Sequence, residues 1–241
     1  MKALILGSGL GSRLYPLTKI TPKCLIDVKR KPMLEHIVEN LDKSKYIGEI
    51  HIVYKNRFEN QFKEFANSFT HNKIIELTND KDKNEDEMPG SIGTIDYFVK
   101  TKRLNEDLMV VAGDNLFCFD IDEFIDSYYK HNKKTTIAVY EFNDKKKVAG
   151  KFGVVELDGH NRLINFEEKP QEPKTSLAAT LCYILSNEDL NHLDKKRFKE
   201  NAGELIKHLV ENGQEVYGFK FDGKWFDIGT HDDLETARKE F

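Results

Sequence analysis

Along the first half of the chain, the spacing of apolar residues alternates between that of buried strands and that of amphipathic helices. Short apolar runs at 3–6, 49–54, 73–77 and 107–112 predict strands, because each is short and ends at glycine or polar residues. Between them, apolar side chains recur at helical spacing in the segments 33–41, 58–69 and 92–102. This βαβαβ order predicts an α/β fold with a Rossmann-like, mostly parallel sheet flanked by helices.

The second half of the chain is richer in strand patterns. Within the first half, polar residues at 79–89 predict a loop. No internal repeat is visible, and no run of about 18 apolar residues suggests a membrane span. Strands are predicted at 135–142, 153–157, 163–167, 177–185 and 215–221, and helices at 187–194, 203–211 and 231–239.

Composition narrows the classes of partner and compartment. The formal net charge is −4, which argues against a general nucleic-acid binder, whose domain is normally basic. The three cysteines are far apart and form no C-x-x-C pair, so neither a disulfide framework nor a zinc knuckle is indicated. The eight histidines show no metal-ligand spacing either. With no signal-peptide pattern at the N-terminus, we expect a cytoplasmic protein that binds neither nucleic acid nor membrane.

The first predicted strand runs into a glycine-rich loop followed by two cationic side chains. Gly7, Gly9 and Gly11 alternate with other residues, and Arg13 and Lys23 follow. Glycines let backbone N–H groups converge on an anion, because no Cβ blocks the approach. Together with the two cations, the loop predicts a site that grips a polyphosphate.

Two better-known glycine motifs fit this segment less well. A dinucleotide-binding turn needs Gly-x-Gly-x-x-Gly, but its third glycine position holds Ser12. We also expect no α-helix to begin at 13–16, because Pro16 would disrupt its first turn. A Walker loop is excluded because no Gly-Lys-Ser/Thr follows at the required spacing.

Two aspartates from distant segments suggest a magnesium site. Asp114 follows the predicted strand at 107–112, and Asp227 lies near the C-terminus. In open α/β sheets, ligands bind beyond the carboxyl ends of the strands, so Asp114 and the glycine loop should face the same cleft. Mg²⁺ prefers one or two carboxylates together with substrate phosphates and water. A turn or loop position would explain each aspartate alone, but the pair beside a phosphate loop favours metal.

These motifs resemble, in order and over nearly the whole chain, those of the sugar-1-phosphate nucleotidyltransferases. The family signature Gly-x-Gly-x-Arg-Leu-x-Pro-Leu-Thr matches 9–18, and Pro-Lys-x-Leu matches 22–25. Its magnesium motifs Gly-Asp and Asp-x-Gly-Thr match 113–114 and 227–230, and its sugar-phosphate motif Glu-Lys-Pro matches 168–170. Many relatives continue into a left-handed β-helix, of which this sequence shows no repeat.

The sequence departs from the family pattern at three places. The loop opens Gly7-Ser8-Gly9 instead of Ala-Gly-Gly, although Ser8 is small enough for the loop to close over phosphate. The family's base-binding segment is matched only in part by the glycines at 90 and 93, where a plain helix entry capped by Ser91 is the simpler interpretation. Leu181 replaces a glycine that relatives carry before a tyrosine, which leaves the sugar open.

The resemblance implies a role for individual residues. Arg13 and Lys23 are the implied catalytic residues, and Asp114 and Asp227 the implied Mg²⁺ ligands. The implied nucleotide-binding residues are Leu6, Gly7, Ser8, Gly9, Gly11, Ser12, Gly90, Gly93 and Asp114, and the implied sugar-phosphate-binding residues are Gly153, Glu168, Lys169 and Thr180.

The reaction implied by the resemblance joins a nucleoside triphosphate to a sugar-1-phosphate and releases pyrophosphate. We expect a single domain over 1–241, with 1–118 mainly binding the nucleotide and 119–241 mainly binding the sugar phosphate, and a homo-oligomer is compatible with it. The Glu-Glu-Lys-Pro form at 167–170 favours dTTP or UTP with glucose-1-phosphate. GTP with mannose-1-phosphate, CTP with another phosphorylated alcohol, and a nucleotide-sugar-binding regulatory subunit without turnover remain alternatives.

Overall fold

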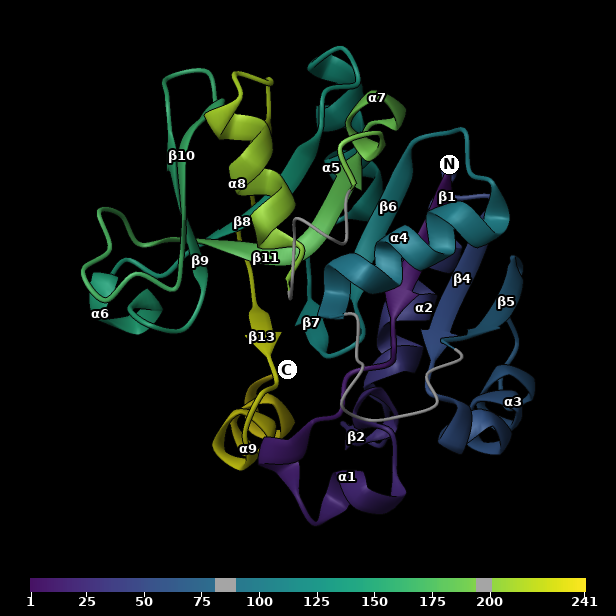
Figure 1. Cartoon of the computed structure of the whole chain (residues 1–241). Coiled ribbons are helices and arrows are strands. Elements are labelled where there is room, and N and C mark those ends of the chain that lie inside the picture. Colours follow the sequence, from purple (N-terminus) through teal and green to yellow (C-terminus); the bar gives the residue numbers. More distant parts are fainter. Residues whose placement is uncertain (81–89, 194–200) are drawn as a thin grey trace. The chain divides into compact units, whose positions relative to one another are not determined.

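The computed structural model of the chain describes residues 1–80, 90–193 and 201–241. They form two compact units, which are described separately. Unit 1 comprises Met1–Met88, Val110–Ile121 and Gly223–Phe241, and unit 2 comprises Pro89–Met109 and Asp122–Asp222. Both ends of the chain therefore belong to unit 1, and Figure 1 draws the N-terminus in purple and the C-terminus in yellow.

Unit 1 is built on parallel strands. β1 (Lys2–Leu6) pairs in parallel with β4 (Glu49–Tyr54), which pairs in parallel with β5 (Ile74–Asn79). β6 (Leu108–Ala112) lies on the other side of β1 (Figure 1). The connections between the parallel strands contain α2 (Met33–Lys43) and α3 (Glu59–Asn67), whose apolar stripes are buried. The predicted α/β fold with a mostly parallel, helix-flanked sheet is confirmed.

Several short elements follow β1 in unit 1. A 3₁₀ turn, η1 (Ser12–Leu14), precedes the one-turn helix α1 (Leu17–Ile20), and a second 3₁₀ turn, η2 (Lys23–Leu25), follows. No α-helix begins at 13–16, in agreement with the argument from Pro16, and the 3₁₀ turn ends before that proline. The remaining elements of this unit are β2 (Asp27–Val28), β3 (Lys31–Pro32), η3 (Asn56–Phe58), β7 (Asn115–Phe117), β13 (Trp225–Asp227) and α9 (His231–Glu240).

Unit 2 is mainly antiparallel. β11 (Leu177–Leu185) pairs with β8 (Thr136–Glu141) on one side and with β9 (Gly153–Leu157) on the other. β10 (Leu163–Glu168) is antiparallel to β9, and β12 (Tyr217–Lys220) pairs in parallel with β8. The helices are α4 (Gly90–Lys102), α5 (Ile121–Lys130), α6 (Lys145–Val148), α7 (Asn187–Leu190) and α8 (Gly203–Glu211).

The structure differs from the sequence prediction at several elements. α5 was not predicted, although its apolar residues recur at helical spacing and are buried. α6 was not predicted either, and Asp144 caps it by accepting a hydrogen bond from the Lys146 amide at 2.9 Å. α7 ends at Leu190, so the helix predicted at 187–194 is shorter, and residue 194 lies outside the described residues. Most of the predicted loop, 81–89, also lies outside them.

The described residues bury a continuous set of apolar side chains in each unit. In the part of the chain that the structure describes, no helix combines the length and the apolar character that crossing a bilayer requires.

Candidate active site

The glycine loop after β1 is tightly packed at two of its three glycines. Gly7 donates its backbone N–H to Val53 O at 2.9 Å, and a Cβ on Gly7 would lie 2.9 Å from the same oxygen. Gly11 has φ +61°, and a Cβ there would lie 3.0 Å from Thr18 and 3.2 Å from Lys23. Gly9 has no heavy atom within 4 Å of its Cβ position. A ligand therefore meets no steric barrier at the middle of the loop.

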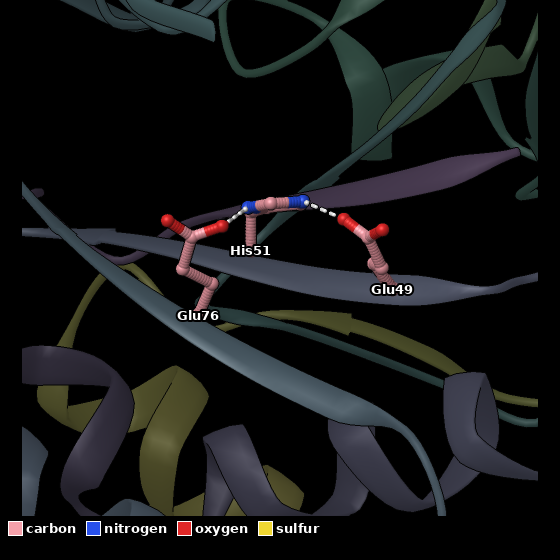
Figure 2. A group of neighbouring side chains, drawn as sticks. All are labelled: Glu49, His51 and Glu76. Atoms are coloured by element: carbon pink, nitrogen blue, oxygen red, sulfur yellow. Dashed lines mark hydrogen bonds and ion pairs between the residues drawn. The ribbon is translucent and has the colours of Figure 1, made fainter.

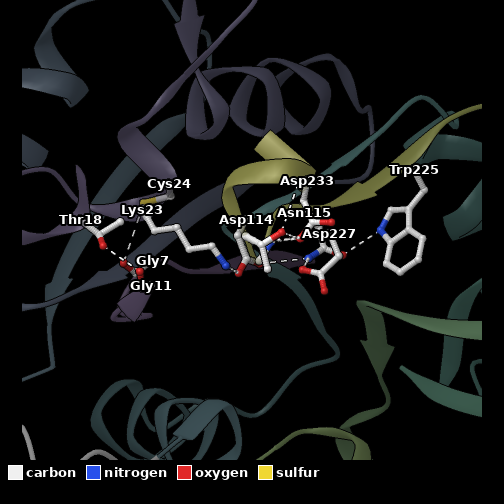
Figure 3. Close-up of polar contacts among 12 residues, drawn as sticks. Gly7, Gly11, Thr18, Lys23, Cys24, Asp114, Asn115, Trp225, Asp227 and Asp233 are labelled. Atoms are coloured by element: carbon white, nitrogen blue, oxygen red, sulfur yellow. Dashed lines mark hydrogen bonds and ion pairs between the residues drawn. The ribbon is translucent and has the colours of Figure 1, made fainter. Parts of the chain in front are cut away.

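The second cation of the motif reaches the first aspartate. Lys23 opens η2 and is buried, and its Nζ forms an ion pair with Asp114 Oδ2 (Figure 3). Gly113 lets the chain after β6 pass close to the end of β1, because a Cβ on it would lie 2.8 Å from the Leu6 carbonyl. Loop and aspartate thus meet at one edge, as expected for residues that follow the carboxyl ends of β1 and β6.

A short strand pair places the second aspartate, Asp227, near Asp114. β13 and β7 are antiparallel, and their register places Asp227 directly opposite Asn115. Burial, and next the charge of Asp114, raise the pKa of Asp227 to about 6. Burial opposes ionisation of Asp114 as well, but the Lys23 ammonium and hydrogen bonds outweigh it and hold the pKa of Asp114 below its usual range. The pair is thus two crowded carboxylates that share one nearby lysine.

The Arg13 guanidinium lies next to Gly229, in the loop that follows Asp227. A Cβ on Gly229 would lie 3.0 Å from Arg13 Nη2, so the guanidinium lies against the bare backbone that follows Asp227. The charge of Arg13 is among the influences that lower the pKa of Asp227. Asp233 holds the loop in place by accepting hydrogen bonds from the Gly229 amide at 3.2 Å and the Thr230 amide at 2.8 Å.

The two aspartates fit a divalent cation. Their carboxylate oxygens are the hard ligands that Mg²⁺ prefers. Burial, and next the charge of Asp114, raise the pKa of Asp227, and a neighbouring cation would oppose both effects. The donor set and its electrostatics therefore fit a divalent cation.

Unit 2 brings the predicted sugar-phosphate residues together. Glu168 ends β10 directly opposite Gly153 on β9. A Cβ on Gly153 would lie 2.6 Å from the Phe166 ring, so the glycine makes room for that ring. Lys169 follows in the left-handed region with φ +47°, and its Nζ lies 3.7 Å from Glu168 Oε1. Burial raises the pKa of Glu168, although the neighbouring Lys169 ammonium opposes this effect.

The other predicted site residues lie in secondary structure or beside the glycine loop. The buried Thr180 hydroxyl donates to Ala138 O at 2.9 Å, so backbone already uses its proton. Gly90 starts α4 with φ +58°, and Gly93 is buried in the first turn of this helix. Ser91 does not cap α4, since it lies inside the helix and its Oγ accepts a hydrogen bond from the Ala202 amide at 2.7 Å. Leu6, Ser8 and Ser12 lie in or beside the glycine loop.

Four contributors to the site were not assigned a role from the sequence. Asn115 and Trp225 lie just outside the motifs at 113–114 and 227–230, and Gly229 lies within the second of them. The contacts of Gly229 and Gly203 are known only from the folded chain. A Cβ on Gly203, at the start of α8, would lie 2.8 Å from Glu168 Oε2. No local pattern reveals such contacts, because the partners are distant in sequence.

A separate group of metal-type side chains lies at the opposite, amino-terminal end of β4 and β5. His51 Nε2 lies 3.1 Å from Glu49 Oε2, and His51 Nδ1 lies 3.2 Å from Glu76 Oε2 (Figure 2). The register explains the group, since Glu76 lies opposite His51 and Lys2 lies opposite Glu49. Lys2 also donates to Glu49 at 2.8 Å. Each ring nitrogen thus faces a different carboxylate, and the Lys2 ammonium supplies positive charge beside Glu49.

His51 should make stability depend on pH. Burial lowers the pKa of this histidine, although the two glutamates oppose the effect. The unfolded chain therefore takes up the proton at a higher pH than the folded protein does. The stabilisation is complete above the ordinary histidine pKa of about 6.5 and is lost as the pH falls below it. Urea unfolding between pH 5 and 8 should show a shallower pH dependence for His51→Gln, and an unchanged one for the exposed His160→Gln. Equal slopes for all three proteins would contradict this assignment.

A parallel-sheet edge that carries a glycine loop, two cations and two crowded aspartates defines a nucleotide-transferring class of protein. The chain belongs to the nucleotidyl transferase family, whose model matches residues 2–241. This confirms the family resemblance seen in the sequence.

Two curated relatives are archaeal proteins named "Bifunctional protein GlmU". The one from Methanocaldococcus jannaschii is 31% identical over an alignment of 245 positions that covers 99% of this chain and 54% of that protein. The one from Methanococcus maripaludis is 32% identical over an alignment of 252 positions that covers 100% of this chain and 54% of that protein. The chain thus spans about half the length of these relatives.

Two solved structures share the fold. A Bacillus anthracis protein assigned as a glucose-1-phosphate thymidylyltransferase, in complex with sucrose, is 27% identical with a TM-score of 0.79. The match covers 99% of this chain and 94% of that one. A UDP-glucose pyrophosphorylase complexed with UDP-glucose is 20% identical with a TM-score of 0.78, covering 99% and 97% of the two chains, and shows the fold alone.

Proposed function

We propose that the protein transfers a nucleotidyl group from a nucleoside triphosphate to a sugar-1-phosphate. The observation that carries the proposal is the grouping, beside the glycine loop of unit 1, of two cations with two crowded carboxylates. Membership of the nucleotidyl transferase family supports the reaction class. The products are a nucleoside-diphosphate sugar and pyrophosphate.

The proposed step needs charge neutralisation more than proton transfer. An oxygen of the sugar phosphate attacks the α-phosphorus of the triphosphate. The bond from this phosphorus to the oxygen that bridges to the β-phosphate breaks, and pyrophosphate leaves with the electron pair. The attacking oxygen is already anionic at pH 7, so no general base is required. The obstacle is the repulsion of two polyanions, which amounts to several kcal/mol at close range in a partly dry site.

The residues of unit 1 offset that repulsion in the proposed mechanism. Arg13 stabilises the charge that develops on the leaving pyrophosphate, and Lys23 holds the α-phosphate or its bridging oxygen. Because Lys23 is paired with Asp114, incoming phosphate has to compete with that carboxylate for the ammonium. Asp114 and Asp227 would hold Mg²⁺, which when bound supplies further neutralisation and polarises phosphoryl oxygen. Residues 6–12 position the phosphates, and the glycines at 90 and 93 contact the base.

The sugar phosphate is assigned to residues of unit 2. Glu168 accepts hydrogen bonds from sugar hydroxyls, and Lys169, with its side chain largely exposed, neutralises the phosphate. Gly153 and Thr180 complete the proposed set. The sequence-based assignment of 1–118 mainly to the nucleotide and 119–241 mainly to the sugar phosphate stays a prediction. The two units divide the chain differently, since unit 1 includes residues 223–241 and unit 2 includes residues 89–109.

Gly203→Ala tests the sugar side. The new Cβ would lie 2.8 Å from Glu168 Oε2 and displace that carboxylate. We expect the KM for the sugar phosphate to rise roughly tenfold, because small misplacements of a binding group are costly, with the affinity for the triphosphate unchanged. Gly159→Ala is the matched control, since its Cβ would meet nothing within 4 Å. An unchanged KM for Gly203→Ala would remove Glu168 from sugar binding.

The substrates are proposed as dTTP or UTP with glucose-1-phosphate, which the assignment of the Bacillus anthracis neighbour supports. A grid of nucleoside triphosphates against hexose-1-phosphates, N-acetylated hexosamine phosphates and other phosphorylated alcohols, read as pyrophosphate release with Mg²⁺ present, tests this. GTP with mannose-1-phosphate and CTP with a phosphorylated alcohol are the competing pairs. Nucleotide-sugar binding without pyrophosphate from any pair would instead favour a regulatory subunit and refute turnover.

A further inference from the structure

Asn115 lies between the two aspartates and contacts both of them. Its side-chain nitrogen Nδ2 donates to Asp114 Oδ1 at 3.0 Å and to Asp227 Oδ1 at 3.2 Å (Figure 3). An amide nitrogen carries two hydrogens, so each carboxylate can receive one of them. A single amide thus bridges the two residues assigned to the metal.

Trp225 determines which way this amide faces. Its indole Nε1 donates to Asn115 Oδ1 at 2.8 Å. An indole N–H is only a donor, so the atom that receives it must be the amide oxygen. In the reversed orientation the NH₂ group would face the indole N–H, and the amide oxygen would face two carboxylates. The tryptophan therefore directs both amide hydrogens toward the aspartates.

The strand pair β7–β13 accounts for the arrangement. Asn115 lies directly opposite Asp227, so their side chains project on one face of the ladder. Trp225 precedes Asp227 by two residues and shares that face. Asn115 is 4% exposed and Trp225 is 7% exposed, so water competes weakly for these hydrogen bonds.

We propose that Asn115 is a positioning residue for the divalent cation, holding Asp114 and Asp227 at a set separation. Its amide occupies Oδ1 of both aspartates. A cation would therefore bind Oδ2 of Asp227 and compete with Lys23 for Oδ2 of Asp114. Without the amide, two buried carboxylates of like charge would move apart or turn away from each other. The inference rests on the proposed metal role of the two aspartates.

Mn²⁺ binding to the nucleotide-free protein tests the proposal directly. Free Mn²⁺ is measured by electron paramagnetic resonance during titration of the unmodified protein and of Asn115→Leu, which keeps the side-chain volume. We expect the dissociation constant to rise about 10- to 100-fold, as for other groups that orient metal ligands. Metal-free triphosphate affinity, measured by calorimetry, should stay unchanged, whereas a general loss of structure would weaken both.

Asn165→Leu is the matched control. Asn165 also bridges two carboxylates through one amide nitrogen, with Glu156 at 2.8 Å and Glu167 at 3.0 Å, but it belongs to unit 2. Its removal should leave Mn²⁺ affinity unchanged. An equal loss in both variants would overturn the positioning role.

Two further variants keep the outcome decisive. Trp225→Phe retains Asn115 and removes the indole N–H, so it should weaken Mn²⁺ binding. Where both variants fold, the loss should be smaller than in Asn115→Leu. Unchanged Mn²⁺ affinity in Asn115→Leu, or in Trp225→Phe where only that protein folds, overturns the inference. Asp227→Asn in the same series separates the two hypotheses: if it alone weakens binding, only the inference fails, and if it too has no effect, the proposed metal site fails with it.

Discussion

Arg13→Ala is expected to lower kcat by about two orders of magnitude or more, the usual cost of losing one preorganised charge donor. The guanidinium lies against Gly229, beside the loop that follows Asp227, where the proposed reaction builds negative charge on the leaving pyrophosphate. Because that charge grows during the reaction, the loss should appear in kcat more than in KM. Pyrophosphate release at saturating substrates provides the measurement.

Arg238→Ala is the control for this variant. Arg238 is a surface arginine of the same unit whose guanidinium binds Asp27 O and Glu235, so its removal should not change the rate. Arg13→Lys should fall between the unmodified protein and the alanine variant, because lysine keeps the charge without the planar donor group. An unchanged rate in Arg13→Ala would exclude Arg13 from the chemistry.

Asp227→Asn is expected to raise the Mg²⁺ concentration needed for half-maximal rate by about tenfold or more, since even groups that only orient metal ligands contribute that much. The substitution removes a carboxylate that a cation would neutralise but keeps the size of the side chain. The measurement is a Mg²⁺ titration of the rate at fixed, saturating substrates. Asp232→Asn, an exposed carboxylate in the first turn of α9, should titrate like the unmodified protein. Identical titrations for both variants would argue against Asp227 as a ligand.

The same carboxyl group should give metal binding a characteristic pH dependence. Burial and Asp114 raise the pKa of Asp227 to about 6, so a proton occupies the carboxyl below that pH and competes with the cation. In the unmodified protein, Mg²⁺ affinity should therefore fall as the pH drops through 6. Asp227→Asn cannot take up this proton and should lack that step. Calorimetric Mg²⁺ titrations at several pH values distinguish the two cases.

Features carried by local patterns were predictable from the sequence. The apolar run at β1, the glycines after it and the helical stripe of α2 lie close together in the chain, and each has a local physical cause. The parallel order then followed from the alternation of strands and helices. From that order came the meeting of the glycine loop with Asp114, which the Lys23 ion pair displays.

Features that depend on distant partners were not predictable in the same way. β7 and β13 are three residues each, too short to show a period, and they form because residues far apart in sequence pair with each other. The roles of Gly203 and Gly229 depend on Glu168 and Arg13, which only the folded chain brings near. Similarly, the sequence could not show that the Thr180 hydroxyl donates a hydrogen bond to a carbonyl of the neighbouring strand.

The pairing of β7 with β13 has an evolutionary consequence. Immediately beyond it, the Cys118 amide donates to Lys224 O at 3.1 Å, so the chain leaves for unit 2 and returns at neighbouring points. The spacing of Asp114 and Asp227 is thus set locally, within unit 1, whatever the intervening segment contains. With the roles proposed above, mutation or insertion in that segment would alter which phosphorylated acceptor is recognised, while the two carboxylates proposed to bind metal keep their geometry.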